Sequence, residues 1–518
     1  MNLTKVLVAN RGEIALRVTR TLRRMGVRSV AVFSEADAQS LHPRLADESV
    51  LLGGAPSSES YLNGERVIDA ALRTGAQAIH PGYGFLSEQA KFARKVEDAG
   101  LIFVGPTPDN IRTLGDKVAA REALTEAGIP PVPGSHAAIT DFKSLLPLAD
   151  SVGFPVIMKA TAGGGGKGIR VIRNVDELES AWNGARGEAL SAFGSSEMIL
   201  ERYLERARHV EVQVLGDGHG GVRVFYERDC STQRRLQKVL EETPSPAVSA
   251  RLREKLLSTS ATAMSKTRYR GAGTLEFLMT ESEELFFLEM NTRLQVEHPI
   301  TEATAGVDLV QEQVEIAAGK RLSKWAGSLE NAVTQPRGAA VEFRVNAEDP
   351  SNSWMPATGI VNALRWPAGP GIRVDSALAL GDEVTAHYDS LLAKIIAHGP
   401  DRDIAFARLR VALSETVLGG VINNLPLGCA LCSDDALLSA QNHCQYLEQR
   451  MGDRSFFPGE VLEAELPLAV AAAAWLRRQQ IRAAVGTNKQ PSQGWGSRSQ
   501  KSWRSRTDRA ERYEVEGS

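Results

Sequence analysis

Cysteine is scarce in this chain, with four cysteines among 518 residues. So few cysteines cannot build a disulfide framework for a chain of this length, which favours a reducing cytoplasm. The sequence also lacks a long hydrophobic run, because the apolar stretch 466–476 is far shorter than the roughly 20 residues of a membrane helix. Its first residues run directly into a predicted strand and show no signal-peptide pattern. We therefore expect a cytoplasmic protein without a membrane segment.

An excess of charge of either sign is missing as well. The chain has 60 Lys and Arg against 63 Asp and Glu, a formal net charge of −3. This balance gives no electrostatic case for nucleic acid as a partner. The hydrophobic share of 43% and the charged share of 24% are ordinary for a globular protein. A chain of this length exceeds one hydrophobic core, so we expect about three domains.

Two alternating segments, 273–279 and 285–291, flank a short polar stretch and predict a β-hairpin. The alternation places on one face of the second strand Phe286, Leu288 and Met290. A simple antiparallel register sets Glu276 opposite Glu289, roughly 5 Å apart at Cβ, and two carboxylates that close need a proton or a cation between them. Together with Asn291 they form a set of hard oxygen ligands that suits Mg²⁺ or Mn²⁺ holding phosphates. The alternative is two solvated glutamates on an exposed face.

A dense polar segment follows the second strand. Arg293, Gln295 and Glu297 stand within five residues, and Pro299 ends the segment. Few purely structural segments need a cation, an amide and an acid so close together. The stretch 289–299, Glu-Met-Asn-Thr-Arg-Leu-Gln-Val-Glu-His-Pro, resembles the active-site signature of the biotin carboxylases, which are the ATP-grasp subunits or domains of biotin-dependent carboxylases.

A glycine run separates two predicted strands nearer the middle of the chain. The four glycines Gly163–Gly166 precede Lys167 and Gly168, and Lys159 ends the strand before them. Consecutive glycines form no stable regular element, but their N–H groups can fold around phosphate oxygens. No Gly-Lys-Ser/Thr opens a helix, so this is not a Walker loop. We interpret the run as a mobile phosphate lid, with a flexible hairpin tip as the alternative.

The N-terminal part alternates strand, glycine turn, helix and strand over residues 5–33, which predicts a parallel sheet. Two stretches, 9–17 and 80–88, resemble landmarks of the biotin carboxylase N-terminal domain, and residues 337–446 read as an α+β block. The resemblance implies a multidomain α/β and α+β fold. Its parts would be a Rossmann-like (pre-ATP-grasp) domain at 1–114, an ATP-grasp domain at 115–330 with a glycine-rich lid at about 131–203, and a C-terminal α+β domain at 331–449. The resemblance ends there, and the composition of residues 450–518 predicts a helix followed by a disordered tail.

The resemblance also implies a set of site residues. ATP would be held by Lys117, Lys159, Gly163, Gly164, Gly165, Gly166, Lys167, Gly168, Glu201, Arg202, Tyr203, Leu204, His209, Gln233, Glu276 and Glu289. The metal ligands would be Glu276, Glu289 and Asn291, and bicarbonate would be bound by Lys238, Arg293, Gln295 and Val296. Glu297 would act as the base on bicarbonate, and Arg344 would stabilise the enolate of biotin. The alternative for Arg344 is a surface arginine paired with Glu342 or Glu348.

Departures from the family pattern are few. Leu236 stands where the family commonly has His or Asn, so a hydrogen bond made by that side chain is missing here.

Cys429 and Cys432 form a single CxxC without a second spaced pair, which favours buried thiols over zinc.

The expected function is ATP-dependent carboxylation of biotin by bicarbonate, as the biotin carboxylase component of an acyl-CoA carboxylase. The alternatives are another ATP-grasp ligase that forms carboxyphosphate, such as one acting on ammonia, and a non-catalytic nucleotide-binding scaffold.

The chain contains no Met-Lys-Met, and neither Lys489 nor Lys501 has a flanking Met. We therefore expect a biotinyl carrier in trans, together with a carboxyltransferase subunit and a homodimeric assembly.

Overall fold

The computed structural model describes residues 3–452, except 116, 126–127, 129, 136, 162–167 and 351. The predicted glycine lid Gly163–Gly166, Lys167, the side chain of Lys117 and the segment beyond Gly452 lie outside the described residues. Within the described part of the chain, no helix is both long enough and apolar enough to cross a membrane.

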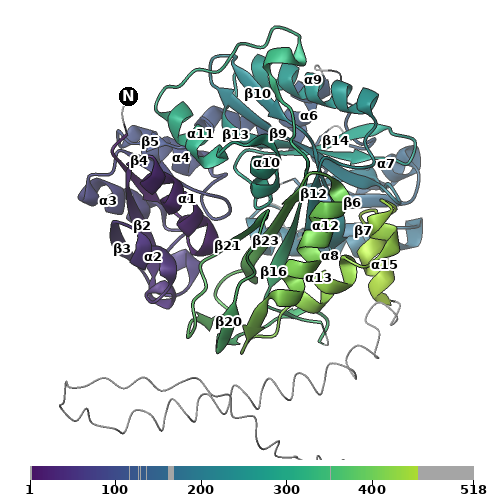
Figure 1. Cartoon of the computed structure of the whole chain (residues 1–518). Coiled ribbons are helices and arrows are strands. Elements are labelled where there is room, and N and C mark those ends of the chain that lie inside the picture. Colours follow the sequence, from purple (N-terminus) through teal and green to yellow (C-terminus); the bar gives the residue numbers. More distant parts are fainter. Residues whose placement is uncertain are drawn as a thin grey trace, which may run out of the picture. The chain divides into compact units, whose positions relative to one another are not determined.

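The first layer is a five-stranded parallel sheet with the order β3-β2-β1-β4-β5, shown in purple and blue in Figure 1. Its strands are β1 (Lys5–Val8), β2 (Arg28–Ser34), β3 (Glu48–Gly53), β4 (Ala78–His80) and β5 (Ile102–Phe103). The associated helices are α1 (Gly12–Arg24), α2 (Leu41–Leu45), α3 (Gly64–Thr74), α4 (Ala90–Asp98) and α5 (Pro108–Leu114). The strand order reverses between β1 and β4, and ligands of open α/β sheets bind at such switch points. The stretches 9–17 and 80–88, which resemble landmarks of the biotin carboxylase N-terminal domain, begin at the carboxyl ends of β1 and β4.

A small antiparallel sheet with the order β7-β6-β8 packs on two helices. Its elements are α7 (Leu145–Val152), β6 (Val156–Ala160), β7 (Ile169–Ile172), α8 (Leu178–Phe193) and β8 (Met198–Arg202). These elements share a hydrophobic core of their own, which runs from Ile139 to Leu200 and includes Trp182. This part of the segment 131–203, for which the sequence predicts a lid, therefore has a hydrophobic cluster of its own.

The largest sheet has ten strands and joins the middle of the chain to its C-terminal part. Its main order is β14-β13-β9-β11-β12-β16-β23-β21, while β10 pairs with β9 and β15. The strands are β9 (Arg208–Asp217), β10 (Val222–Phe225), β11 (Arg228–Arg234), β12 (Gln237–Thr243), β13 (Arg270–Met279), β14 (Leu285–Asn291), β15 (Val333–Thr334), β16 (Ala339–Asn346), β21 (Ile372–Ser376) and β23 (Leu391–Gly399). Because β12 pairs with β16, side chains from both parts meet on one continuous surface.

Helices cover this sheet, and short strands complete the C-terminal part. The helices are α6 (Lys117–Thr125), α9 (Ala250–Lys266), α10 (His298–Ala305), α11 (Leu309–Ala317), α12 (Arg402–Glu415), α13 (Leu425–Leu431), α14 (Asp435–Leu438) and α15 (Tyr446–Gly452). The short strands are β17 (Glu348–Asp349), β18 (Met355–Pro356), β19 (Gly359–Ile360), β20 (Ala363–Arg365), β22 (Glu383–Val384) and β24 (Val417–Gly419). Helix α9 packs on β9 and β10, and α12 packs on β16 and β23.

The predicted hairpin is present, and its register is confirmed: Glu276 pairs with Glu289. A register shift follows at once, so that Phe277 pairs with Phe287 and Leu288 is left without a partner residue on β13. The prediction that Leu288 shares a face with Met290 was therefore wrong, because the extra residue of a bulge interrupts the alternation. Leu288 lines the main cavity, whereas Met290 packs in the core.

The aromatic pair of this hairpin supports the core beneath the site. Phe277 is fully buried, and its ring lies edge-on to that of Phe287 with the centroids 6.1 Å apart. We expect Phe277→Ala to lower the free energy of unfolding by about 3–5 kcal/mol, because the substitution leaves a cavity in close-packed surroundings. Urea unfolding followed by circular dichroism measures the change. The exposed Leu190 of α8 provides the control, since Leu190→Ala should alter stability by no more than about 0.5 kcal/mol. Equal effects of the two substitutions would contradict this account of the core.

Candidate active site

A cavity of about 470 Å³ collects most of the predicted residues. It is lined by Lys159, Glu201, Arg202, Tyr203, Leu204, His209, Gln233, Lys238, Glu276, Glu289, Asn291, Arg293, Gln295, Val296, Glu297 and Arg344. Tyr83 and Gly84 of the N-terminal layer complete the wall. Gly168 is also predicted to bind the nucleotide, but it does not line the cavity. A Cβ atom at its position would meet the Cβ atoms of Ala160 and Ala189 at 3.3 Å.

One partly buried ammonium group lies at the centre of the charged wall. Lys238 Nζ donates to Glu211 Oε2 at 2.6 Å, to Glu276 Oε1 at 2.9 Å and to Glu297 Oε1 at 2.5 Å. Burial works to lower the pKa of Lys238, but the surrounding carboxylates, Glu211, Glu276 and Glu297, raise the pKa well above its ordinary value. The lysine is therefore charged throughout the physiological range.

The pKa values of the three carboxylates that contact Lys238 are shifted in different directions. Burial works to raise the pKa of Glu297, but Lys238 and Arg344 hold it far below its ordinary value. The pKa of Glu276 is likewise well below normal, because Lys238 and His209 outweigh burial. Burial dominates at Glu211 and raises its pKa. Glu276 and Glu297 are thus ionised at neutral pH.

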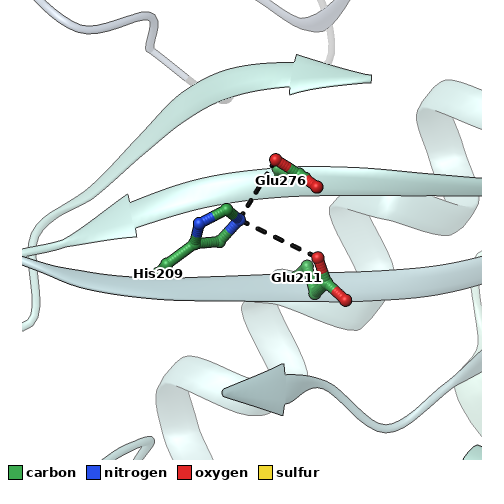
Figure 2. Close-up of side chains that lie close together, drawn as sticks. All are labelled: His209, Glu211 and Glu276. Carbon is green, nitrogen blue, oxygen red and sulfur yellow. Dashed lines mark ion pairs between the residues drawn. The ribbon is translucent and has the colours of Figure 1, made fainter. Parts of the chain in front are cut away.

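His209 connects two of these acids, as Figure 2 shows. Its Nε2 lies 3.1 Å from Glu276 Oε2 and 3.8 Å from Glu211 Oε2. Its Nδ1 lies 2.8 Å from Gln233 Nε2, an amide nitrogen that can only donate, so Nδ1 accepts and the proton sits on Nε2 facing Glu276. One histidine and two carboxylates this close could hold a metal ion. Lys238 contacts both Glu211 and Glu276, so its ammonium group already serves as the cation between these two carboxylates.

Arg344 reaches the polar segment from the neighbouring strand β16. Its Nε donates to Glu241 Oε1 at 2.5 Å and its NH2 group to Glu297 Oε2 at 3.0 Å. The alternative pairing with Glu342 or Glu348 was wrong, since the β12–β16 pairing places Glu241 beside it and Glu348 binds Arg234. The two oxygens of Glu297 are thus held by two different cations.

Arg293 is held from the N-terminal layer. Its Nε donates to Glu88 Oε2 at 2.7 Å, and its NH2 group donates to Asn291 Oδ1 at 2.8 Å. The backbone N–H of Thr292 donates to Glu88 Oε1 at 3.0 Å. The landmark 80–88 thus supplies the residue that fixes the start of the polar segment.

Arg228 is a fully buried residue that the motifs did not indicate as functional. It donates to Glu211 Oε1 at 2.6 Å and to Gln295 Oε1 at 2.8 Å, and Gln295 in turn donates to Glu276 Oε1 at 2.7 Å. Arg228 thereby fixes two groups of the cavity wall. The available sequence signals are the polar stretch 227–238, which contains Arg228, and the alternation of residues 209–213, which contains Glu211.

Glu201 marks the other end of the cavity. Lys159 Nζ donates to its Oε2 at 2.6 Å, and Arg121 of α6 contacts its Oε1. Glu201 and both cations are buried. Arg121 stands in an ordinary helical pattern, and nothing in the local sequence indicates that it reaches the site.

Leu236, which departs from the family pattern, lies in the turn between β11 and β12. Leu236 has a φ of +64° and Arg235 a φ of +49°, in the left-handed region that L side chains rarely adopt. Leu236 is 47% exposed and lines the cavity. An apolar side chain therefore occupies a strained position at the rim, where a polar one could donate to a ligand.

Comparison with known proteins places this geometry in a family. Residues 2–111 match the family described as biotin carboxylase, N-terminal domain; residues 116–325 match carbamoyl-phosphate synthase L chain, ATP binding domain; and residues 342–449 match biotin carboxylase C-terminal domain.

The chain is 48% identical over 451 residues to the biotin carboxylase of Haemophilus influenzae, covering 87% of this chain and 99% of that protein. It is 45% identical over 450 residues to a biotin-dependent acyl-coenzyme A carboxylase alpha3 subunit of Mycobacterium leprae, covering 86% of this chain and 74% of that protein. The crystal structure of the biotin carboxylase domain dimer of Hydrogenobacter thermophilus 2-oxoglutarate carboxylase, with MgADP, ADP and bicarbonate, superimposes with a TM-score of 0.83 at 43% identity, covering 87% of this chain and 98% of that one. The chain belongs to the biotin carboxylases.

Proposed function

We propose that this chain uses ATP and bicarbonate to carboxylate biotin on a carrier protein, as the biotin carboxylase component of an acyl-CoA carboxylase. The observation that carries the proposal is the shared contact of Lys238 and Arg344 with Glu297, in the same cavity as the Glu276–Glu289 pair. One pocket thus offers oxygen ligands for a metal–phosphate group, a base and two cations for an anion.

The nucleotide would lie along the wall that contains Lys159, Glu201–Leu204, His209 and Gln233. The Lys159–Glu201 pair sits where a ligand could contact both charges. Lys117 and the glycine lid 163–168 would close over the phosphates, as the family resemblance implies.

The metal would be held by Glu276, Glu289 and Asn291. The donors fit a hard divalent cation, since two carboxylates face each other across β13 and β14 and an amide oxygen stands at the end of β14. Bound Mg²⁺ or Mn²⁺ would neutralise charge on the transferred phosphoryl group.

Bicarbonate would bind between Lys238, Arg293, Gln295 and Val296, next to Glu297. Glu297 is ionised and can accept the proton of bicarbonate, whose oxygen then attacks the γ-phosphorus to form carboxyphosphate and release ADP. In the resting site Lys238 and Arg344 hold both oxygens of Glu297 and weaken it as a base. Bicarbonate that takes the ammonium as its own partner would return basicity to Glu297.

Biotin would enter beside Arg344. Carboxyphosphate breaks down to CO₂ and phosphate, and the phosphate takes the N1′ proton of biotin. The Arg344 guanidinium would stabilise the resulting enolate oxygen while the nitrogen attacks CO₂. We further propose a biotinyl carrier in trans, a carboxyltransferase subunit as the next user of carboxybiotin, and a homodimer.

The first expected outcome is bicarbonate-dependent ATP hydrolysis. Purified protein with Mg-ATP should release phosphate at a rate that rises with bicarbonate, and free biotin should raise the rate further. A coupled assay for ADP measures both effects, and ammonia in place of biotin is the control for another carboxyphosphate-forming ligase. A rate indifferent to bicarbonate would refute the mechanism.

A second expected outcome separates the two half-reactions. Arg344→Ala should lower biotin carboxylation by on the order of 10²-fold, the scale for losing a group that stabilises an oxyanion, while Mg-ATP still binds. Glu289→Gln should instead weaken the use of Mg-ATP, because one metal ligand loses its charge. Titration with Mg-ADP and a biotin carboxylation assay distinguish the two, and Arg365→Ala, at an exposed arginine, is the control. The same loss of nucleotide affinity in both variants would show that the roles are misassigned.

A further inference from the structure

Lys394 of β23 is a fully buried lysine that no sequence motif singled out. Its Nζ donates to the carbonyl oxygen of Val296 at 2.8 Å. Val296 and Glu297 belong to the polar segment that lines the cavity, whereas Lys394 itself is not part of the cavity wall. The ammonium group thus contacts the segment that we propose to bind bicarbonate, without itself lining the cavity.

This contact fixes the direction of a peptide group. A trans peptide is planar, and its C=O and N–H point in opposite directions. When Lys394 holds the carbonyl of Val296 on the buried side, the N–H of Glu297 is turned away from that side. The neighbouring peptide is fixed in the same way, because His298 Nδ1 lies 2.7 Å from the carbonyl oxygen of Gln295 and must donate to it. Two successive N–H groups, of Val296 and Glu297, are thereby oriented by buried donors.

The charge of Lys394 is balanced by groups outside the cavity. Glu13 Oε1 of α1 lies 3.3 Å from its Nζ, and Asp375 Oδ2 lies 3.8 Å away. Asp375 is also bound by Arg373 at 2.6 Å, so Glu13 is the partner that depends most on Lys394. The hydroxyl group of Tyr83 donates to Glu13, and the Tyr83 ring lines the cavity. Both N-terminal landmarks of the sequence therefore converge on this lysine.

We propose that Lys394 is a positioning residue for bicarbonate: by holding the carbonyl of Val296, it aims the backbone N–H groups of the Val296–Glu297 turn at the anion. The proposal rests on the proposed function and adds a residue to it. Lys394 is not part of the cavity wall, so its effect on bicarbonate would pass through the backbone of the turn. Glu13 and Tyr83 hold the ammonium in place, which gives the N-terminal layer a part in anion binding.

The test is a set of variants measured for ATP hydrolysis with bicarbonate and Mg-ATP varied separately. Lys394→Met keeps the length of the side chain and removes the donor. The KM for bicarbonate should rise by about tenfold, the scale of one lost hydrogen bond to a charged donor, while the KM for Mg-ATP changes by less than about twofold. Lys95→Met, at an exposed lysine of α4 that pairs with Glu65, is the matched control and should leave both constants unchanged.

A double variant separates positioning from stability. Lys394→Met leaves Glu13 buried without its cation, which lowers stability, and adding Glu13→Gln removes that unpaired charge. The double variant should melt close to the wild type yet keep the raised KM for bicarbonate. An unchanged bicarbonate KM in Lys394→Met, an equal rise in both KM values, or a return of the bicarbonate KM in the double variant would overturn the proposal. Wild-type hydrolysis that ignores bicarbonate would instead refute the proposed function itself.

Discussion

The contact of one partly buried ammonium group with three buried carboxylates is the interaction on which the rest of the site depends. Lys238 comes from β12, Glu211 from β9 and Glu276 from β13, while Glu297 precedes α10. Without the lysine, three buried acids would lie side by side with less positive charge among them, and buried charge that is not compensated is costly. The strand order β13-β9-β11-β12 therefore also brings the acids of β9 and β13 within reach of the lysine on β12. The cation stands at the point where all these elements meet.

Alternating charges continue outward from this centre. Arg228 lies behind Glu211 and Gln295, and Arg344 lies between Glu297 and Glu241. Burial raises the pKa of Glu241 to about 7 even though Arg344 opposes it, so of the two carboxylates that bind Arg344 Glu241 is less firmly ionised than Glu297. Buried ion pairs add little net stability compared with well-packed apolar groups, but they permit few geometries. The network thus holds the charged groups of the cavity in one arrangement.

The continuity of the large sheet explains how distant parts of the chain share one site. Because β12 pairs with β16, Arg344 reaches the signature segment directly. The N-terminal layer contributes through Glu88 on Arg293 and through Glu13 on Lys394. Each of these contacts joins elements that are far apart in sequence, so the polar segment is supported by both the N-terminal layer and the large sheet.

The sequence by itself determined the features that depend on short-range order. Alternation and a polar turn fixed the hairpin register that sets Glu276 opposite Glu289, and the signature after β14 identified the family. The biotin carboxylase architecture and the wall residues from Lys159 to Arg344 followed from those motifs. Tertiary structure alone decided the rest. The bulge that turns Leu288 into the cavity, the pairing of Arg344 with Glu241, and the approach of Arg121 and Lys394 from behind the site depend on which strands become neighbours. That choice is made by burial over the whole core, and a local pattern of residues does not contain it.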